Sequence, residues 1–162
     1  MKIYLSLLLL LLAGFVRADE LRILTTPQEG CFTITGSVST DKCVILSDAN
    51  DAEVVSTVIE CLKSDIKAVT RKAILSYKTL PEGKNPIIVG TIGQSSYIDQ
   101  LIADGKLDVS DVKGKWEAFG LQVIDNPMEG VSQALVIYGS QPRGTAYGMF
   151  ELSRMMGVSP WI

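Results

Sequence analysis

The sequence predicts an α/β domain in which about three helices pack on a mixed, open β-sheet, with an α+β arrangement as the alternative. Short apolar runs typical of strands alternate with segments of helical periodicity, in the order strands, helix, strands, helix, strands, helix. The length of 162 residues and a composition of 47% apolar and 20% charged residues fit one globular domain with its own core. No repeat, low-complexity segment or linker divides it.

The predicted strands are short runs bounded by glycine, proline and other turn residues. The run at 86–90, "PIIVG", is wholly apolar, as expected for a strand covered on both faces. Cys31 and Cys43 fall in two runs that we expect to be neighbouring strands. The full set of expected strands is 21–26, 31–35, 43–47, 74–77, 86–90, 119–124 and 134–138.

Three segments show helical periodicity. In the first, Asn50 and Glu53 have the spacing of a capping box, and apolar residues then recur every three to four positions. The second covers 97–103, and the last begins near Pro142 and ends at 156, with Gly157 as its C-terminal stop. The apolar stripe expected on the first helix comprises Val54, Val55, Val58, Ile59, Leu62, Ile66 and Val69.

The first eighteen residues have the pattern of a cleaved secretory signal. Lys2 supplies a positive start, a short apolar run follows, and Ala18 stands before the expected cleavage site. The apolar run is too short for a membrane-spanning helix of about 20 residues. We therefore expect residues 19–162 to be a single domain, secreted or periplasmic, with no membrane attachment after cleavage.

The composition excludes several chemistries within these 162 residues. There is no histidine, which excludes Ser-His-Asp and Cys-His nucleophiles and histidine-ligated metals, and we expect no metal or other cofactor. The net charge of −3 gives no reason to expect a nucleic-acid partner. An exported chain could pair two of its three cysteines, but the simpler interpretation makes Cys31, Cys43 and Cys61 small core residues, with Cys61 buried on a helix.

Two turns between a strand and a helix contain glycine, "VGTIGQSS" and "YGSQPRGT". Such turns can direct backbone N–H groups at an anion. Neither matches a phosphate loop or a dinucleotide fingerprint, so the favoured role of these glycines is turn geometry and close packing between helix and sheet.

Gly144 and Gly148 lie on one face of the last helix and allow close approach of another backbone, from this sheet or from another domain. Arg143, in the first turn, is unfavourable with the helix dipole, so either it pairs with a carboxylate or ligand, or it extends into solvent. Carboxylate pairs for glycoside chemistry exist by count alone, and we interpret them as solvated surface charges. They are Glu117 with Asp125 or Glu151.

Three stretches within residues 85–161 form a recognisable pattern: "PIIVGTIGQSSYIDQLIADGKLD", "GKWEAFGLQVI" and "ALVIYGSQPRGTAYGMFELSRMMGVSPW". Together they resemble the amino-terminal domain of glycoside hydrolase family 115, the xylan α-glucuronidases. The chain departs from the family at Gln141 and Pro142, where an acidic and then a basic residue are usual.

The resemblance implies an accessory domain of the kind that precedes a (β/α)8 barrel. In the family, the barrel removes glucuronic or 4-O-methylglucuronic acid from xylan, so glucuronoxylan is a partner through the parent protein. None of the catalytic positions lies in this sequence, which we expect to be a fragment truncated before the barrel and inactive alone. The residues expected at the interface with the barrel are Arg143, Gly144, Tyr147, Gly148 and Trp161.

Three functions are therefore weighed. The first is a non-catalytic domain of a secreted xylan α-glucuronidase, whose last helix exposes apolar surface through Tyr147, Phe150, Met155 and Trp161. The second is a free-standing exported carbohydrate-binding module, although Trp116 is expected to pack against the sheet. The third is a nucleotide-binding enzyme, which the expected export and the missing motif residues disfavour.

Overall fold

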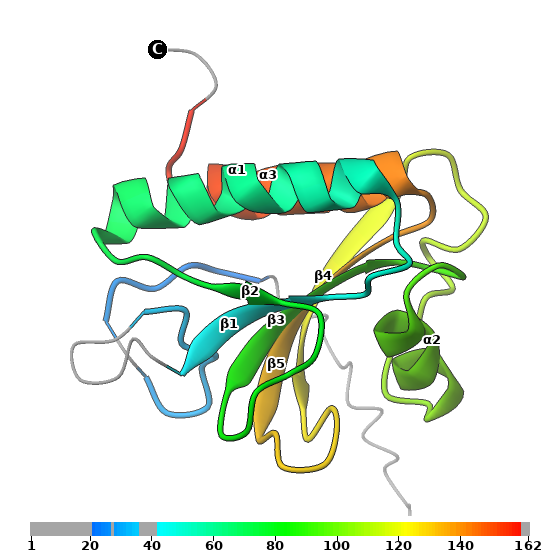
Figure 1. Ribbon diagram of the computed structural model, residues 1–162, viewed down its shortest axis with the longest axis horizontal. Helices are drawn as coiled ribbons and strands as arrows, with labels where there is room; N and C mark the ends of the chain where they lie inside the picture. Colours follow the sequence, from blue (N-terminus) through cyan, green and yellow to red (C-terminus); the bar gives the residue numbers. More distant parts are fainter. Residues whose placement is uncertain (1–20, 27, 36–41, 160–162) are drawn as a thin grey trace, which may run out of the picture.

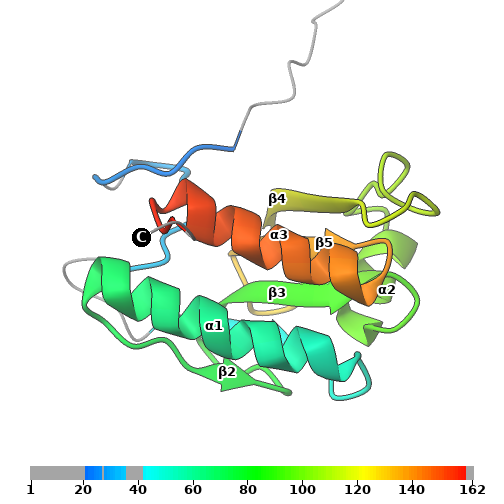
Figure 2. The same ribbon diagram turned by 90° about the horizontal axis from the view of Figure 1, so that it is seen from above.

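The computed structural model describes residues 21–26, 28–35 and 42–159. A five-stranded sheet forms the middle layer, helices α1 and α3 lie side by side on one face, and α2 lies on the other (Figures 1 and 2). This is the α/β class with a mixed sheet and three helices, as the sequence predicts. The elements in chain order are β1 (Cys43–Ser47), α1 (Glu53–Thr70), β2 (Ser76–Tyr77), β3 (Asn85–Thr91), α2 (Ser96–Ala103), β4 (Phe119–Asp125), β5 (Gln133–Gly139) and α3 (Pro142–Met155).

The strands are arranged in the order β2-β1-β3-β5-β4. The first four are parallel, and β4 pairs antiparallel with β5 from Phe119 opposite Gly139 to Asp125 opposite Gln133. Because β1, β3 and β5 are parallel, their carboxyl ends meet at one edge of the sheet, where the three helices begin. That edge is where ligands bind in many open α/β sheets.

Alternating side chains divide the interior into two cores. On one face, Ile45, Ile87 and Ile137 pack under α1 and α3, and on the other Leu46 and Ile88 pack against α2. The central strands are buried on both faces, which explains their nearly continuous apolar sequence. The helices supply the rest of both cores with inward-facing residues such as Leu62, Met149 and Leu152 on one side, and Ile98 and Leu101 on the other.

The prediction of strands at 21–26 and 31–35 is wrong. Neither segment joins the sheet. Leu21, Phe32 and Ile34 instead pack, partly buried, against the core beneath α1 and α3. Their apolar pattern reflects this packing, and the pattern alone cannot show whether a neighbouring strand is available for pairing.

The start of α1 also differs from the prediction. The helix begins at Glu53 after an extended Ala52 that makes no side-chain cap. Asp48 accepts a hydrogen bond from the backbone N–H of Asn50 at 2.8 Å, and this turn moves the start of the helix beyond the expected cap.

The apolar stripe of α1 is narrower than predicted. Val55, Val58, Ile59, Leu62 and Ile66 are buried, whereas Val54 and Val69 are exposed. Val54 is turned about 100° around the helix from Val55. Val69 lies in the last turn, which projects beyond the sheet in Figure 1.

The prediction that all three cysteines lie in the core holds for Cys43 alone. Cys43 is buried in β1, while Cys31 and Cys61 are exposed, and all three are free thiols. Cys61 lies on the outer face of α1 next to the buried Leu62. Burial raises the pKa of the Cys43 thiol to about 12, so this thiol stays protonated near neutral pH.

The remaining elements are confirmed within a residue or two at their ends, and the segment expected at 74–77 is the short strand β2. Gly157 has a positive φ of 89°, as expected of the residue that follows a helix. No helix in the part of the chain that the structure describes is long and apolar enough to cross a membrane. The expected signal segment and Trp161 lie outside the described residues.

Candidate functional site

The carboxyl edge of the parallel strands carries a cluster of polar side chains. Asp48 follows β1 and is buried, with 7% of its surface exposed. Its carboxylate accepts hydrogen bonds from the backbone N–H of Ser96 at 2.8 Å and from the Ser96 hydroxyl. These bonds, led by that of the Ser96 hydroxyl, lower the pKa of Asp48. A carboxylate of the chain itself therefore occupies the anion position at the start of α2.

A second carboxylate, that of Asp51, also binds backbone N–H groups at this edge of the sheet. Asp51 accepts from the backbone N–H of Thr91 at 2.7 Å and from that of Ala52 at 2.8 Å. The hydroxyls of Thr91 and Thr145 are 2.9 Å apart, and this contact joins the end of β3 to the first turn of α3. A phosphate would have to displace these carboxylates or lie against their negative charge. This arrangement argues against nucleotide binding at the edge of the sheet.

The glycines at this edge serve close packing, as the sequence predicts. A Cβ atom on Gly90 would collide with Ser95 and lie 2.7 Å from Cγ1 of Ile98, and one on Gly139 would collide with the backbone nitrogen of Thr145. Neither glycine has a positive φ, so the requirement is space rather than backbone conformation. The strands can approach the starts of α2 and α3 this closely only without a side chain.

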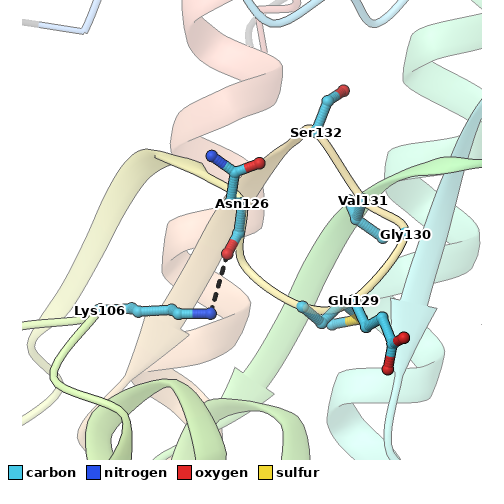
Figure 3. A pocket seen from close by; sticks show the side chains of 7 residues that line it. Lys106, Asn126, Glu129, Gly130, Val131 and Ser132 are labelled. Atoms are coloured by element: carbon cyan, nitrogen blue, oxygen red, sulfur yellow. Dashed lines mark hydrogen bonds between the residues drawn. The ribbon is translucent and has the colours of Figure 1, made fainter.

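A shallow hollow of about 560 Å³ lies at the opposite edge of the sheet, beside the turn between β4 and β5 (Figure 3). Lys106 closes one side of it by donating to the backbone oxygens of Asn126 at 2.9 Å and Pro127 at 3.1 Å. Glu129 is the one carboxylate in its lining. A second hollow of about 300 Å³ lies between α3 and β4, and Glu151 is its one carboxylate. Neither hollow offers the pair of carboxylates that glycoside hydrolysis uses.

The three carboxylates considered from the sequence do not converge on a cleft. Glu117 is 2.9 Å from the guanidinium of Arg143, and Glu151 is 2.6 Å from that of Arg154. Asp125 accepts a hydrogen bond of 3.0 Å from the side-chain amide of Gln133. Across the described ranges, no group of three or more histidine, cysteine, aspartate or glutamate side chains is placed to hold a metal ion.

The two glycines of α3 face their own sheet. A Cβ atom on Gly144 would collide with the carbonyl oxygen of Ala118, and one on Gly148 would lie 2.8 Å from Cγ2 of Ile137. Both glycines are buried. The sequence allows these glycines to face either this domain's sheet or another domain. The structure shows them facing this domain's sheet and the segment that leads into β4.

The opposite face of α3 is exposed and carries Arg143 and Tyr147. Arg143 donates to the Tyr147 hydroxyl at 3.0 Å, its guanidinium lies 5.9 Å from the centre of that ring, and Glu117 is its ionic partner. The Tyr147 hydrogen bond and the Glu117 charge raise the pKa of Arg143. Of the alternatives that the sequence leaves open for this arginine, the structure shows a carboxylate partner, Glu117 from the segment before β4.

Three exposed aromatic residues belong to the two segments that form this ion pair, Trp116 next to Glu117, and Tyr147 and Phe150 on α3. Trp116 is 75% exposed, so the prediction that it packs against the sheet is wrong. Its neighbour Glu117 adopts a positive φ of 50°, which directs the chain away before β4 begins. Tyr147 is 37% and Phe150 47% exposed, as expected for the last helix. Nothing in the spacing of residues 114–124 signals the exposure of Trp116, because it depends on this local backbone turn.

The comparisons with known proteins give a single line of evidence. No protein-family model and no curated protein matches this sequence. A solved structure that matches is a family GH115 4-O-methyl-α-glucuronidase with specificity for decorated arabinogalactans, at 36% identity and a TM-score of 0.57. The match covers 74% of this chain and 14% of that enzyme. The likeness supports a relation to family GH115, and the chain corresponds to a small part of the larger glycosidase.

Proposed function

We propose that the chain is a non-catalytic accessory domain of a secreted α-glucuronidase and that it packs against the (β/α)8 barrel of that enzyme. The observation that carries the proposal is the match itself, at 36% identity over 74% of this chain and 14% of the glucuronidase. Three carboxylates also act within the fold, since Asp48 binds the start of a helix and Glu117 and Glu151 bind arginines. They hold structure together and leave the chemistry to the rest of the enzyme.

The outer face of α3 is the contact surface that we assign to the barrel. Tyr147 and Phe150 lie on it and are 37% and 47% exposed. Large apolar side chains grouped on one face are typical of interaction surfaces. Gly144 and Gly148, also considered for this interface, face inward and act by holding α3 close to the sheet.

The reaction proposed for the parent enzyme is removal of glucuronic or 4-O-methylglucuronic acid side chains from glucuronoxylan. The matched enzyme is a 4-O-methyl-α-glucuronidase with specificity for decorated arabinogalactans, so both polysaccharides belong in the test. Export is part of the proposal, with cleavage after Ala18. Mass spectrometry of the exported protein should give an amino terminus at Asp19.

Replacement of the matched segment of the GH115 glucuronidase by residues 19–162 tests the proposal. The hybrid should release 4-O-methylglucuronic acid from its polysaccharide, and the chain alone should release none. Release by the isolated chain would contradict the non-catalytic assignment. A hybrid whose two parts unfold independently would contradict the packing.

A free-standing carbohydrate-binding module is the second candidate, because the exposure of Trp116 at 75% offers a ring for stacking. Passage of the chain over immobilised glucuronoxylan tests it. Retention of the wild type, with loss of retention in Trp116→Ala, would favour this module over the accessory domain.

A further inference from the structure

We infer that Trp116 is the anchor residue of the surface that docks on the barrel, and that its partner is an uncharged protein surface with an apolar recess. This inference rests on the proposed function, and it names which residues carry the contact and what they contact. The surface consists of Trp116, Phe119, Arg143, Tyr147, Phe150 and Arg154, on the segment before β4, the start of that strand and the outer face of α3.

The backbone next to Trp116 is fixed by the fold. The Ala118 carbonyl accepts from the backbone N–H of Ser140 at 2.9 Å and from its hydroxyl at 3.2 Å. Gly144 lies so close to the same carbonyl that no side chain fits between them. The Glu117 side chain is 19% exposed and is bound to Arg143. A large ring that is 75% exposed is therefore carried on a backbone next to fixed residues, so binding has mainly the side-chain rotamers of Trp116 to order.

The outer face of α3 continues the surface. Arg143, Tyr147, Phe150 and Arg154 recur at the spacing of one helix face, so two aromatic rings lie between two arginines. Phe119, 36% exposed, lies beside this helix, with its Cβ 3.4 Å from the position of a Cβ on Gly148. Tryptophan, tyrosine and arginine are the residues enriched where protein interfaces bind most strongly.

The charges on this surface are neutralised within it. Arg143 pairs with Glu117 at 2.9 Å, and Arg154 pairs with Glu151 at 2.6 Å. A paired charge can be covered by a protein surface at much lower cost than an isolated one. The partner therefore needs no opposite charge here, and an uncharged, largely apolar surface is the kind that these internal pairs can accommodate.

A protein partner fits these contacts better than an acidic sugar does. One terminal nitrogen of Arg143 is bound to Glu117 and the other to Tyr147, so a uronate carboxylate that engages both terminal nitrogens would have to share or displace these partners. In the matched glucuronidase the corresponding segment is 14% of the chain, so the remainder supplies a covalently linked surface. The barrel is accordingly the occupant that we assign.

The test compares Trp116→Ala in two settings, the full chain alone and the hybrid in which the chain replaces the matched segment of the GH115 glucuronidase. Alone, the variant should melt at the wild-type temperature because the ring is exposed. In the hybrid, it should lower the melting temperature of the domain by roughly 4 °C or more. Leu75→Ala is the control, because Leu75 is 59% exposed and precedes β2, the edge strand on the other side of the sheet from β4. This substitution should change neither melting temperature.

The outcomes separate the anchor from the proposed function. A hybrid that unfolds in one transition, with no effect of Trp116→Ala, would overturn the anchor and leave the packing in place. A hybrid whose domain melts at the temperature of the isolated chain would overturn both. Binding of xylo-oligosaccharide to the isolated chain that disappears in Trp116→Ala would overturn the protein partner in favour of a sugar.

A second measurement keeps the anchor testable if the hybrid does not fold. The full chain is titrated by calorimetry into the GH115 glucuronidase from which the matched segment has been deleted, after its fold is confirmed by circular dichroism. Trp116→Ala should weaken binding at least about tenfold relative to Leu75→Ala. Equal affinities of the two variants would overturn the anchor, and absence of wild-type binding would overturn both proposals.

Discussion

The two faces of α3 differ in what they have to contact. The inner face carries Gly144, Gly148, Met149 and Leu152, all buried against the sheet and α1. The outer face carries exposed aromatic rings and arginines, including Phe150 directly beside Met149. The inner face is complete within this chain, whereas the outer face retains apolar surface that a partner can cover. The difference separates residues that maintain the fold from residues available for docking.

The largest expected effect comes from Met149→Ala, which removes a side chain with no exposed surface. The lost contacts and the cavity should lower the free energy of unfolding by about 2–5 kcal/mol, measured by urea denaturation. The matched control is Phe150→Ala, at the next residue, which is 47% exposed. This substitution should change the free energy of unfolding by no more than about 0.5 kcal/mol. Similar losses in the two variants would remove the distinction between the faces.

Asp48→Asn tests the edge of the sheet where α2 begins. The asparagine amide has one acceptor oxygen in place of two, so it cannot accept from both Asn50 and Ser96, and it carries no negative charge. The free energy of unfolding should therefore fall by about 1–3 kcal/mol at pH 7. Asp111→Asn, at an exposed carboxylate 3.8 Å from Lys115, is the control and should have little effect.

The same residue predicts a pH dependence. The pKa of Asp48 is lowered in the folded chain, so its contribution to stability is complete above the ordinary carboxyl pKa of about 3.9. It is lost as the pH falls through the lower folded value. Urea denaturation from pH 7 down to pH 3 should therefore show a shallower loss of stability in Asp48→Asn than in the wild type. Parallel curves would contradict this role for the carboxylate.

Gly144→Ala tests the close approach of α3 to the segment before β4. The new methyl group would collide with the Ala118 carbonyl, and the gain in helix propensity offsets part of that cost. We expect a net loss of about 1–2 kcal/mol in the free energy of unfolding. Ser56→Ala, at an exposed position in α1, is the control and should be neutral or slightly stabilising. A Gly144→Ala variant more stable than the wild type would show that α3 and the segment before β4 can move apart without loss of stability.

The smallest effect is expected for Tyr147→Phe on the outer face. The change removes the hydrogen bond from Arg143 and keeps the ring. Thermal denaturation of the isolated chain should register a change within about 0.5 kcal/mol, because the partners are solvent-exposed. A loss above 1 kcal/mol would mean that the outer face, like the inner one, stabilises the isolated fold.

Much of the fold follows from the sequence because the buried strands and amphipathic helices carry strong local patterns. The run at 86–90 and the last helix are examples, and both were predicted within two residues at their ends. Leu21, Phe32 and Ile34 mislead because apolar side chains pack equally well without a hydrogen-bonded neighbour. Whether a segment joins a sheet depends on partners distant in sequence.

The surface could be predicted less completely than the interior. The exposure of Tyr147 and Phe150 follows from helical spacing. The place of Arg143 in the first turn leaves open a carboxylate or ligand partner or extension into solvent, and the structure shows the carboxylate partner. The partner Glu117 and the exposure of Trp116 depend on a positive φ at a residue other than glycine, which has no clear sequence signal. Long-range geometry brings these residues together beside α3.

The most direct test of the outer face as a docking surface is its solvent accessibility before and after attachment to a barrel. Hydroxyl-radical labelling with mass spectrometry would compare Tyr147 and Phe150 in the isolated chain and in the GH115 hybrid, with Leu75 as the reference. The account predicts strong labelling of both rings in isolation, marked protection in the hybrid, and unchanged labelling of Leu75. Equal labelling of Tyr147 and Phe150 in the two proteins would contradict it.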